Sequence, residues 1–453
     1  MRILLATAVA IAPLMVASGA MAEVVISTAR TTPITTLNAT GSGPDSIRID
    51  SNGSITLTSG VAVTVNSSHG FDMDATSRIS MTASADGSTA VLVQGGNTAD
   101  ITIGGTINVL DDITSETDLD TDNDGDNDGP IARGTDRYGL RVVGADPLVG
   151  NILLEAGGTI AVSGNNSYGI SLEAPLTGNL TTFGAVTVRG DGSYAIRTQG
   201  TVSGDLRLIG AVNAQGAGAV GISVEGDVAG TVLVQSALTT TGFRFTSRPP
   251  ERPDGVVDND QNRSFLFLDD LDADDLLIGG PALHISSNIA RGLLLGRPVA
   301  YSAAGIEGDD DNDGVKNGDE DDDGDGTLNR VDGDRDGNGI TDTQETTATV
   351  TSFGSGAAIL IGSATGDVTL GAVGTGDNAY GFINRGSVSA LGVYDGINAN
   401  GVVFEGGAGN AVNIAGGVRN EGTIVSLSFE ADSTAVRLGA GADTPTFLNS
   451  GTI

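Results

Sequence analysis

Aspartates at alternate positions, followed by glycine, form the strongest chemical pattern in this chain. Residues 309–345 hold three successive copies of D-x-D-x-[DN]-G-x5-[DE]. Oxygen atoms at positions 1, 3, 5 and 12 and the carbonyl at position 7 are donors that Ca²⁺ prefers, and glycine at position 6 permits the turn. The pattern predicts tandem, structural Ca²⁺ sites. The ligands we expect are Asp309, Asp311, Asp313, Val315, Glu320, Asp321, Asp323, Asp325, Thr327, Asp332, Asp334, Asp336, Asn338, Ile340, Asp342 and Glu345.

Two further acidic segments match the calcium pattern less well. Residues 118–129 alternate aspartate with other residues but have no acid at a closing position 12. Residues 251–275 place Arg263 where glycine is required, so we expect no tight site there. The alternative for every such segment is a solvated acidic linker. The weaker candidate ligands of the first segment are Asp120, Asp122, Asp124, Asp126 and Asp128.

Charge and composition exclude several classes of protein. The net charge is −35, and residues 111–137, 251–275 and 309–345 hold ten, nine and fifteen of the 57 acidic residues. Such a chain is repelled by nucleic acid and by anionic lipid. It has no cysteine, which excludes disulfides, thiolate zinc sites and a thiol nucleophile. The acid is local, because the rest of the chain is nearly neutral.

The first residues indicate export. Residues 3–22 are apolar, follow Arg2, and end in the small residues Ala20 and Ala22. This arrangement is typical of a secretory signal peptide cleaved after Ala22, and a membrane anchor is the alternative. We expect an exported mature chain that begins at Glu23.

Short phrases recur along the mature chain and predict a solenoid. One phrase places a small residue before alternating aliphatic residues, as in HGF (69–71), YGL (138–140), YGI (168–170), YAI (194–196) and YGF (380–382). Its clearest intervals are 20 residues (69 to 89), 26 (168 to 194), 26 (194 to 220) and 23 (357 to 380). A second phrase, Gly-Ser/Thr-Ile/Val, starts at residues 53, 105, 158, 386 and 422. Short strands at such a period bury their apolar faces only by stacking.

An all-β fold of the parallel β-helix class, interrupted by Asp-rich loops, explains the 69 glycines and the 4% of aromatic residues. A β-sandwich is the competing fold, but it would show hairpins and more core aromatics. The expected organisation is a signal peptide (1–22), coils (23–110), an Asp-rich insertion (111–137), coils (138–243), an acidic insertion (244–280), a coil (281–308), calcium-binding-like loops (309–345) and coils (346–453).

No catalytic motif stands out. His69 and His284 are far apart in sequence, and the chain lacks H-E-x-x-H and G-x-S-x-G. A carboxylate pair on stacked coils would be invisible in the sequence. Arg189, Gly190 and Asp191 form a tripeptide that integrins recognise in some adhesins, but a chain this rich in glycine and aspartate can contain it by coincidence, so we assign it no function.

The phrases NRGSV (384–388), NEGTI (420–424) and NSGTI (449–453) resemble the coils of autotransporter passenger domains. That resemblance implies a right-handed parallel β-helix displayed by a Gram-negative bacterium at its cell surface or outer membrane, or released outside the cell. It also implies a surface ligand on a host or neighbouring cell, or a polysaccharide. The aspartate loops resemble thrombospondin type 3 repeats, without that family's cysteines.

The chain stops at GTI (451–453), a phrase that elsewhere continues as a strand. Autotransporters continue into a membrane β-barrel, so we expect a truncated passenger that reaches the outer membrane only through a C-terminal barrel missing from this sequence. Two functions remain open. One is a non-enzymatic surface or adhesion module with Ca²⁺-stiffened loops. The alternative is a secreted β-helix enzyme that acts on polysaccharide.

Overall fold

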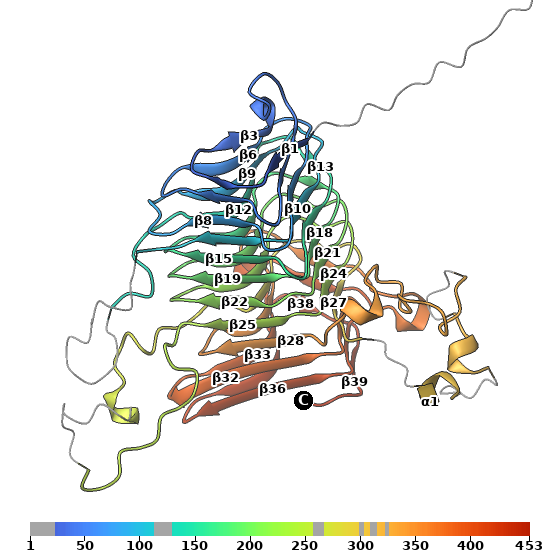
Figure 1. The fold of residues 1–453 in the computed structure, drawn as a ribbon. Helices are drawn as coiled ribbons and strands as arrows, with labels where there is room; N and C mark the ends of the chain where they lie inside the picture. The colour runs from blue at the N-terminus through green and yellow to red at the C-terminus, as the bar shows by residue number, and fades with distance from the viewer. Residues whose placement is uncertain (1–22, 113–128, 257–266, 299–302, 309–314, 322–325) are drawn as a thin grey trace, which may run out of the picture.

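The chain winds into stacked coils, and each full coil adds one strand to each of three parallel sheets (Figure 1). The computed structural model describes residues 23–112, 129–256, 267–298, 303–308, 315–321 and 326–453. Sheet A has twelve strands, and sheets B and C have eleven each. Successive strands within a coil belong to sheets A, B and C in turn. The fold is therefore the parallel β-helix that the repeats predicted.

Sheet A consists of β1 (Glu23–Ile26), β4 (Ser46–Ile49), β7 (Phe71–Met73), β10 (Ile101–Ile103), β14 (Ile152–Leu154), β18 (Leu180–Thr182), β21 (Leu206–Leu208), β24 (Val232–Val234), β27 (Leu293–Leu295), β31 (Phe382–Asn384), β35 (Val418–Asn420) and β39 (Phe447–Asn449). Sheet B consists of β2 (Ala29–Arg30), β5 (Ser54–Thr56), β8 (Arg78–Met81), β11 (Thr106–Val109), β15 (Thr159–Ser163), β19 (Ala185–Arg189), β22 (Val212–Gln215), β25 (Ala237–Thr241), β28 (Thr349–Phe353), β32 (Ser387–Asp395) and β36 (Thr423–Phe429).

Sheet C consists of β3 (Ile34–Thr35), β6 (Val61–Val65), β9 (Thr89–Gln94), β12 (Tyr138–Val143), β16 (Tyr168–Leu172), β20 (Tyr194–Thr198), β23 (Val220–Val224), β26 (Leu283–Ile285), β29 (Ala357–Ile361), β33 (Ala399–Phe404) and β37 (Ser433–Leu438). Two minor sheets contain β13 (Leu148–Val149) with β17 (Leu176–Thr177), and β30 (Val368–Leu370), β34 (Val412–Ile414) and β38 (Ala442–Asp443). The short helices are α1 (Ala303–Ile306), η1 (Thr36–Asn38), η2 (Leu268–Asp270), η3 (Asn317–Asp319), η4 (Asp342–Gln344), η5 (Gly376–Asn378) and η6 (Gly407–Gly409).

The recurring phrases occupy equivalent places in the stack, with two exceptions. Tyr138, Tyr168 and Tyr194 pair directly in sheet C, and the five Gly-Ser/Thr-Ile/Val phrases all enter strands of sheet B. The grouping of HGF (69–71) and YGF (380–382) with the sheet C phrases was wrong. Their phenylalanines begin β7 and β31 of sheet A, because a small residue before an apolar one suits the start of either strand.

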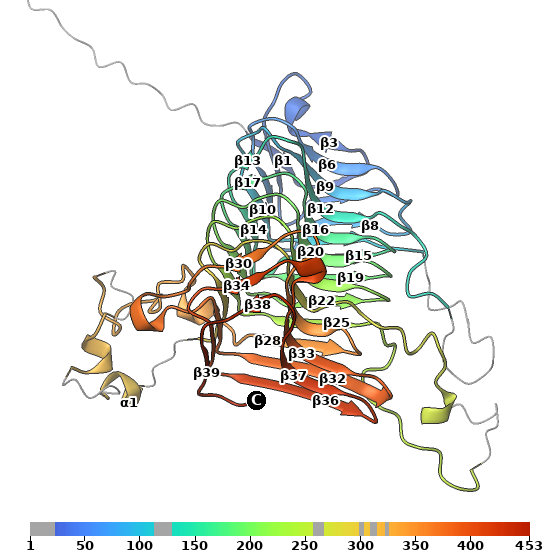
Figure 2. The ribbon, with the colours of Figure 1, turned by 180° about the vertical axis from the view of Figure 1, so that it is seen from behind.

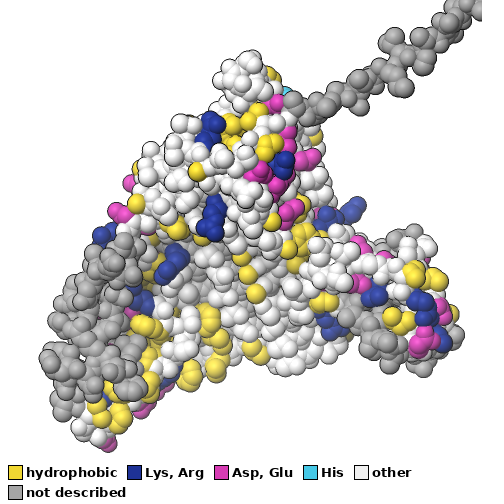
Figure 3. All heavy atoms as spheres, viewed as in Figure 1, with side chains coloured by type: hydrophobic (Ala, Val, Ile, Leu, Met, Phe, Trp, Pro, Cys, Tyr) yellow, Lys and Arg dark blue, Asp and Glu magenta, His cyan; other side chains and the backbone are white. Residues whose placement is uncertain are grey.

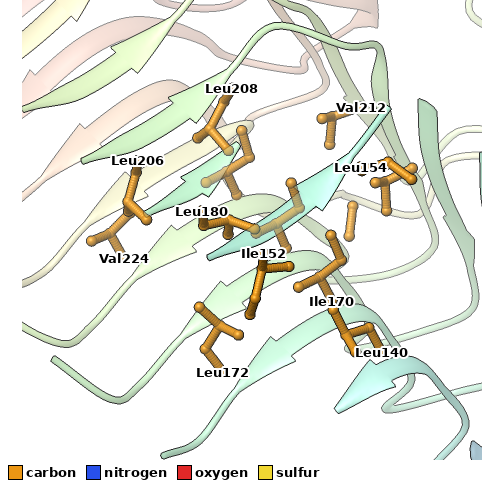
Figure 4. Close-up of a cluster of buried hydrophobic side chains, with 14 of the residues drawn as sticks. Leu140, Ile152, Leu154, Ile170, Leu172, Leu180, Leu206, Leu208, Val212 and Val224 are labelled. Carbon is orange, nitrogen blue, oxygen red and sulfur yellow. The ribbon is translucent and has the colours of Figure 1, made fainter. Parts of the chain in front are cut away.

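Identical positions on successive coils bury one another and form the core. In sheet A an unbroken inward column is almost fully buried, and Figure 4 shows part of the interior. Each rung adds roughly 4.8 Å, so side chains of like shape touch along the axis. Burying each one is worth about 1.5–3 kcal/mol. The column contains Ile47, Phe71, Ile101, Ile152, Leu180, Leu206, Val232, Leu293, Phe382 and Val418.

An asparagine ladder closes the corner between sheets A and B in the last coils. The amide of Asn384 donates to Asn420 Oδ1 at 2.7 Å, and Asn420 Nδ2 donates to Asn449 Oδ1 at 2.7 Å. Asn384 and Asn420 are fully buried, whereas Asn449 is exposed. The ladder, with further hydrogen bonds to the carbonyls of Thr423 and Thr452, satisfies these buried amides.

The acidic segments leave the stack at its corners and do not interrupt it. Residues 111–137 and 244–280 both connect sheet B to sheet C, whereas residues 297–348 connect sheet A to sheet B. Figures 1 and 2 accordingly show the first two on one side of the stack and the third as a separate lobe on the opposite side. Parallel pairing continues across each insertion, as between β27 and β31.

A buried ion pair fastens the first insertion to the coils. Arg137 Nη2 lies 3.6 Å from Asp111 Oδ1, and both side chains are 4% exposed. Asp111 also accepts hydrogen bonds from the amides of Arg133 and Gly134. The two ends of the 111–137 segment are thereby held together.

Among the described residues, no helix has the length and apolar character needed to cross a membrane. The predicted signal peptide, 1–22, lies outside the described residues. Its assignment therefore stays a prediction from the sequence.

The asparagine ladder generates a stability prediction. Asn420→Ala leaves the buried Asn384 amide without its closest acceptor, and we expect it to lower the free energy of unfolding by about 1–3 kcal/mol. Asn449→Ala is the matched control at the exposed end of the same ladder, with an expected change within about 0.5 kcal/mol. Urea unfolding followed by circular dichroism measures both. Equal losses in the two variants would contradict the ladder's role.

Candidate metal centre

The tandem aspartate loops form a lobe beside sheet A. The chain leaves after β27, passes through α1, η3 and η4, and returns at β28. All of the third loop, and parts of the first two, can be described. Five predicted ligands of this lobe and all five weaker ones lie outside the described residues: Asp309, Asp311, Asp313, Asp323, Asp325, Asp120, Asp122, Asp124, Asp126 and Asp128.

All three loops contain one repeated backbone hydrogen bond. The amide at position 9 donates to the carbonyl of the residue that precedes position 1. A shared long-range bond at the same loop position means that the three segments close in the same way. The pairs are Asn317 with Gly308 at 2.9 Å, Asn329 with Glu320 at 2.8 Å, and Asp342 with Gly333 at 2.7 Å.

The second and third loops also share the turn that the motif predicts. The carboxylate of Asp321 accepts the Gly326 amide at 3.0 Å, and that of Asp334 accepts the Gly339 amide at 2.9 Å. Both glycines have positive φ, +94° and +83°. Position 6 needs glycine because other residues rarely adopt this conformation. The turn geometry expected at positions 1 and 6 is present in both loops.

Position 9 carries residues that the motif search missed. Asn317 and Asn329 are buried, and Asn329 Nδ2 donates to the carbonyl of Asn317 at 2.8 Å. Arg335 Nε donates to the carbonyl of Asn329 at 2.6 Å. These bonds join loop one to loop two and loop two to loop three. The spacing of Asn317, Asn329 and Asp342, twelve and thirteen residues, was the available signal.

The third loop is anchored on the outer face of sheet A. Ile340 is 2% exposed and packs in a cluster with apolar residues from three neighbouring strands. Arg207 Nε on β21 donates to the carbonyl of Asn338 at 3.1 Å. Outward-facing positions on successive strands of sheet A are apolar here, which indicates that another part of the chain covers this face. Leu233, Leu294 and Ile383 continue the column that Arg207 begins.

Glu345, the closing acid of the third loop, is held against the coil. Its Oε1 accepts a hydrogen bond at 2.9 Å from Nε2 of Gln235, the residue that directly follows β24. The side-chain amide of Asn338 donates to the same oxygen. Glu345 is 8% exposed and Gln235 is fully buried. The position-12 carboxylate thus ties the loop to the solenoid.

Crowded carboxylates perturb the proton equilibria of this loop. Burial, together with the nearby charges of Glu345 and Asp334, raises the pKa of Asp336 to about 6. Burial also raises the pKa of Asp342, although the backbone amide and guanidinium of Arg335 act in the opposite direction. A bound cation would remove much of this repulsion between like charges.

Two oxygen atoms of the loops have free coordination capacity within the described residues. Asp332 Oδ2 is buried and has no hydrogen-bond partner there, and the carbonyl of Ile340, at position 7, accepts no hydrogen bond there. Both atoms belong to the predicted ligand set and are the hard donors that Ca²⁺ takes. The donor types therefore fit this ion.

The side chains are nevertheless not gathered around one point. In the described parts of the chain, no three Asp, Glu or His side chains converge as a metal cluster. Asp342 pairs with Arg335 at 2.8 Å, and Glu345 faces Asn338 and Gln235. Binding calcium at the third loop requires Asn338 and Glu345 to turn toward Asp334 and Asp336. These are side-chain rotations on a backbone that already has the turn.

The outer face of sheet C carries ordered charge and aromatic ladders. The rings of Tyr138, Tyr168 and Tyr194 stack with centroids 4.9 and 5.7 Å apart. Arg141 and Arg197 make two hydrogen bonds each, at 2.6–3.0 Å, to Glu173 and Glu225, which lie two coils apart. On this face of the described chain, Glu173 and Glu225 are each paired with an arginine.

The histidines and the 189–191 tripeptide occupy structural positions. His69 Nδ1 lies 3.1 Å from Ser67 Oγ, and burial lowers the pKa of His284. The Asp191 carboxylate accepts the amide of Ala217 at 2.8 Å at the turn between β19 and β20. The tripeptide's carboxylate therefore supports a corner of the solenoid.

Comparison with known proteins assigns no family. No family model matches the chain, no curated protein matches it, and no solved structure matches it. The class that the fold defines is a parallel β-solenoid protein with three stacked parallel sheets.

The raised pKa of Asp336 predicts a pH dependence for the calcium-free protein. A carboxyl group with a pKa above its unfolded value stabilises the docked loop at low pH, and this contribution is lost as the pH rises through about 6. We expect residues 326–345 to be cleaved faster by protease at pH 7.5 than at pH 5 in the presence of a chelator. Asp336→Asn should reduce this difference. Comparing the two proteins at each pH cancels the protease's own pH profile, and identical profiles would refute the assignment.

Proposed function

We propose that the protein is an exported, non-enzymatic β-helix that acts at or outside the bacterial surface, and that Ca²⁺ stiffens its aspartate loops. The repeated closure of the three loops carries the metal assignment. One position-9 hydrogen bond recurs in each of them, at 2.7–2.9 Å. A solvated acidic linker has no reason to repeat three times, at one loop position, a hydrogen bond that spans nine residues.

The anchoring of the third loop supports a structural role for the ion. Ile340, in the middle of the loop, packs on sheet A, and the Asn338 carbonyl accepts a hydrogen bond from Arg207 of that sheet. Calcium bound beside these anchors would fix the whole lobe on the coils, because Asn329 and Arg335 link the loops in series. Extracellular calcium levels suit sites with dissociation constants of roughly 10⁻⁴–10⁻³ M.

The carboxylates on the outer face of sheet C favour the non-enzymatic function over the alternative, an enzyme that acts on polysaccharide. Burial alone would raise the pKa of Glu225, but hydrogen bonds from Arg197 and Ser223 and the charge of Arg197 hold it below its usual value. A general acid for glycoside hydrolysis needs a raised pKa. Glu225 stays ionised, and its arginine stabilises the sheet surface. The stacked coils then act as a long, rigid display platform, and the adhesion or surface ligand follows from the passenger resemblance alone.

Calcium titration of residues 23–453 by isothermal calorimetry tests the metal assignment. We expect uptake in the submillimolar to millimolar range, and Asp334→Ala should abolish the contribution of the third loop, since position 1 is both a ligand and a turn former. Asp146→Ala removes the same charge from an exposed site on the coils and should leave uptake unchanged. Absence of uptake by the unmodified protein at 5 mM calcium, a concentration of about five times the weakest expected constant, would overturn the proposal.

A further inference from the structure

A cleft between the aspartate lobe and sheet A gathers arginines in an otherwise acidic protein. Its volume is about 1050 Å³. The lining includes Arg207, Arg291, Arg297, Arg335 and Arg385, which are five of the chain's 22 basic residues. Three acids line the same cleft. Figure 3 shows basic side chains around the junction of the lobe and the coils.

Three of these arginines are engaged by carboxylates. Arg207 Nη2 lies 2.7 Å from Asp205, Arg335 Nη1 lies 2.8 Å from Asp342, and Arg385 Nε lies 3.0 Å from Glu421. These pairs hold the guanidinium groups in place around the cleft. These ion pairs fix the positions of the three guanidinium groups and leave the cleft itself open.

Arg291 and Arg297 differ from the other three. Both are exposed, and neither side chain makes an ion pair or hydrogen bond with any other residue in the described part of the chain. They flank β27, at either end of a strand of three residues. Arg291 and Arg297 therefore supply the unpaired positive charge of the cleft, and Asp336 is the one lining acid without an ion pair in the described part of the chain.

Apolar side chains line part of the cleft. They belong to Leu233, Leu294 and Val373, and the docked third loop contributes Asp336, Gly337 and Asn338. Eight of the sixteen lining residues are charged, and this mixture of apolar and charged groups suits a charged organic molecule better than a lone ion. The cleft is also too large for one inorganic anion.

We propose that this arginine cleft binds a small organic polyanion, a molecule with at least two sulfate, carboxylate or phosphate groups on a compact body. Guanidinium groups match such oxyanions with paired hydrogen bonds. The net charge of −35 does not prevent this, because charges farther away than about 8–10 Å are screened at physiological salt. The inference goes beyond the proposed function, since it requires the docked lobe and not an enzymatic or adhesive role.

The test uses residues 23–453 with saturating calcium and two polyanions of different chemistry. Sucrose octasulfate and a galacturonate trimer carry sulfate and carboxylate groups respectively, and neutral sucrose is the blank. Strong chelators such as citrate and polyphosphate are avoided because they compete for calcium. We expect at least one polyanion to bind by calorimetry, with sucrose silent. The tighter of the two identifies the oxyanion.

The double variant Arg291→Gln, Arg297→Gln should weaken binding about tenfold or more, the effect of losing charge-assisted hydrogen bonds. Both residues are exposed, so its thermal unfolding should match that of the unmodified protein. Arg78→Gln removes one exposed arginine of sheet B and should leave affinity within about twofold. Equal weakening by Arg78→Gln, or no binding of either polyanion by the unmodified protein, would overturn the proposal.

Calcium uptake by the double variant separates the two ideas. Normal uptake with lost polyanion binding supports the cleft and the metal loops independently. Normal polyanion binding without any calcium uptake supports the cleft and refutes the metal assignment. Loss of polyanion binding together with a lowered melting temperature calls for single variants at each arginine, and unchanged affinity in both single variants contradicts the cleft.

Discussion

The structure depends on stacking equivalent residues at a fixed rung spacing. Every coil buries its side chains against the same positions of the coils above and below, as the column from Ile47 to Val418 shows. A β-helix core is narrow, so small and β-branched residues fill it and tryptophan is absent. Insertions are tolerated only where one sheet turns into the next, because a break inside a strand would interrupt the column. The acidic segments all obey this constraint.

Most of the solenoid could be predicted from the sequence, because its signal is repeated. One glycine phrase marks sheet B in five coils, and a second marks sheet C. The two misassigned phrases, at Phe71 and Phe382, show the limit. A local pattern of small and apolar residues identifies a strand start but not the sheet, since both sheets present the same inward face to the same core. The pairing register of the strands on either side of an insertion of tens of residues could be seen only in the three-dimensional structure.

The loops were predictable in chemistry but not in placement. The spacing of aspartate and glycine predicted the turns at Gly326 and Gly339. Anchoring by Ile340, and the arginine cleft that it creates, join residues more than a hundred positions apart. A periodic sequence pattern cannot predict contacts between residues so far apart in the chain. No sequence pattern singles out Arg207, and its significance comes from the lobe that packs beside it.

Stacked side chains stabilise the coils, whereas the excess charge lies mainly in the insertions. The coils are a nearly neutral, rigid platform, while most of the net negative charge lies in corner insertions where a cation can compensate it. We propose that calcium fixes the aspartate lobe on sheet A, and a distance measurement tests this directly. The absence of native cysteine allows Thr177→Cys and Thr343→Cys to carry spin labels on the coil and the third loop. Double electron–electron resonance spectroscopy at pH 7.5 should give one narrow distribution of the distance between the two labels with calcium and a broad one with chelator. Identical distributions in the two conditions would contradict the account.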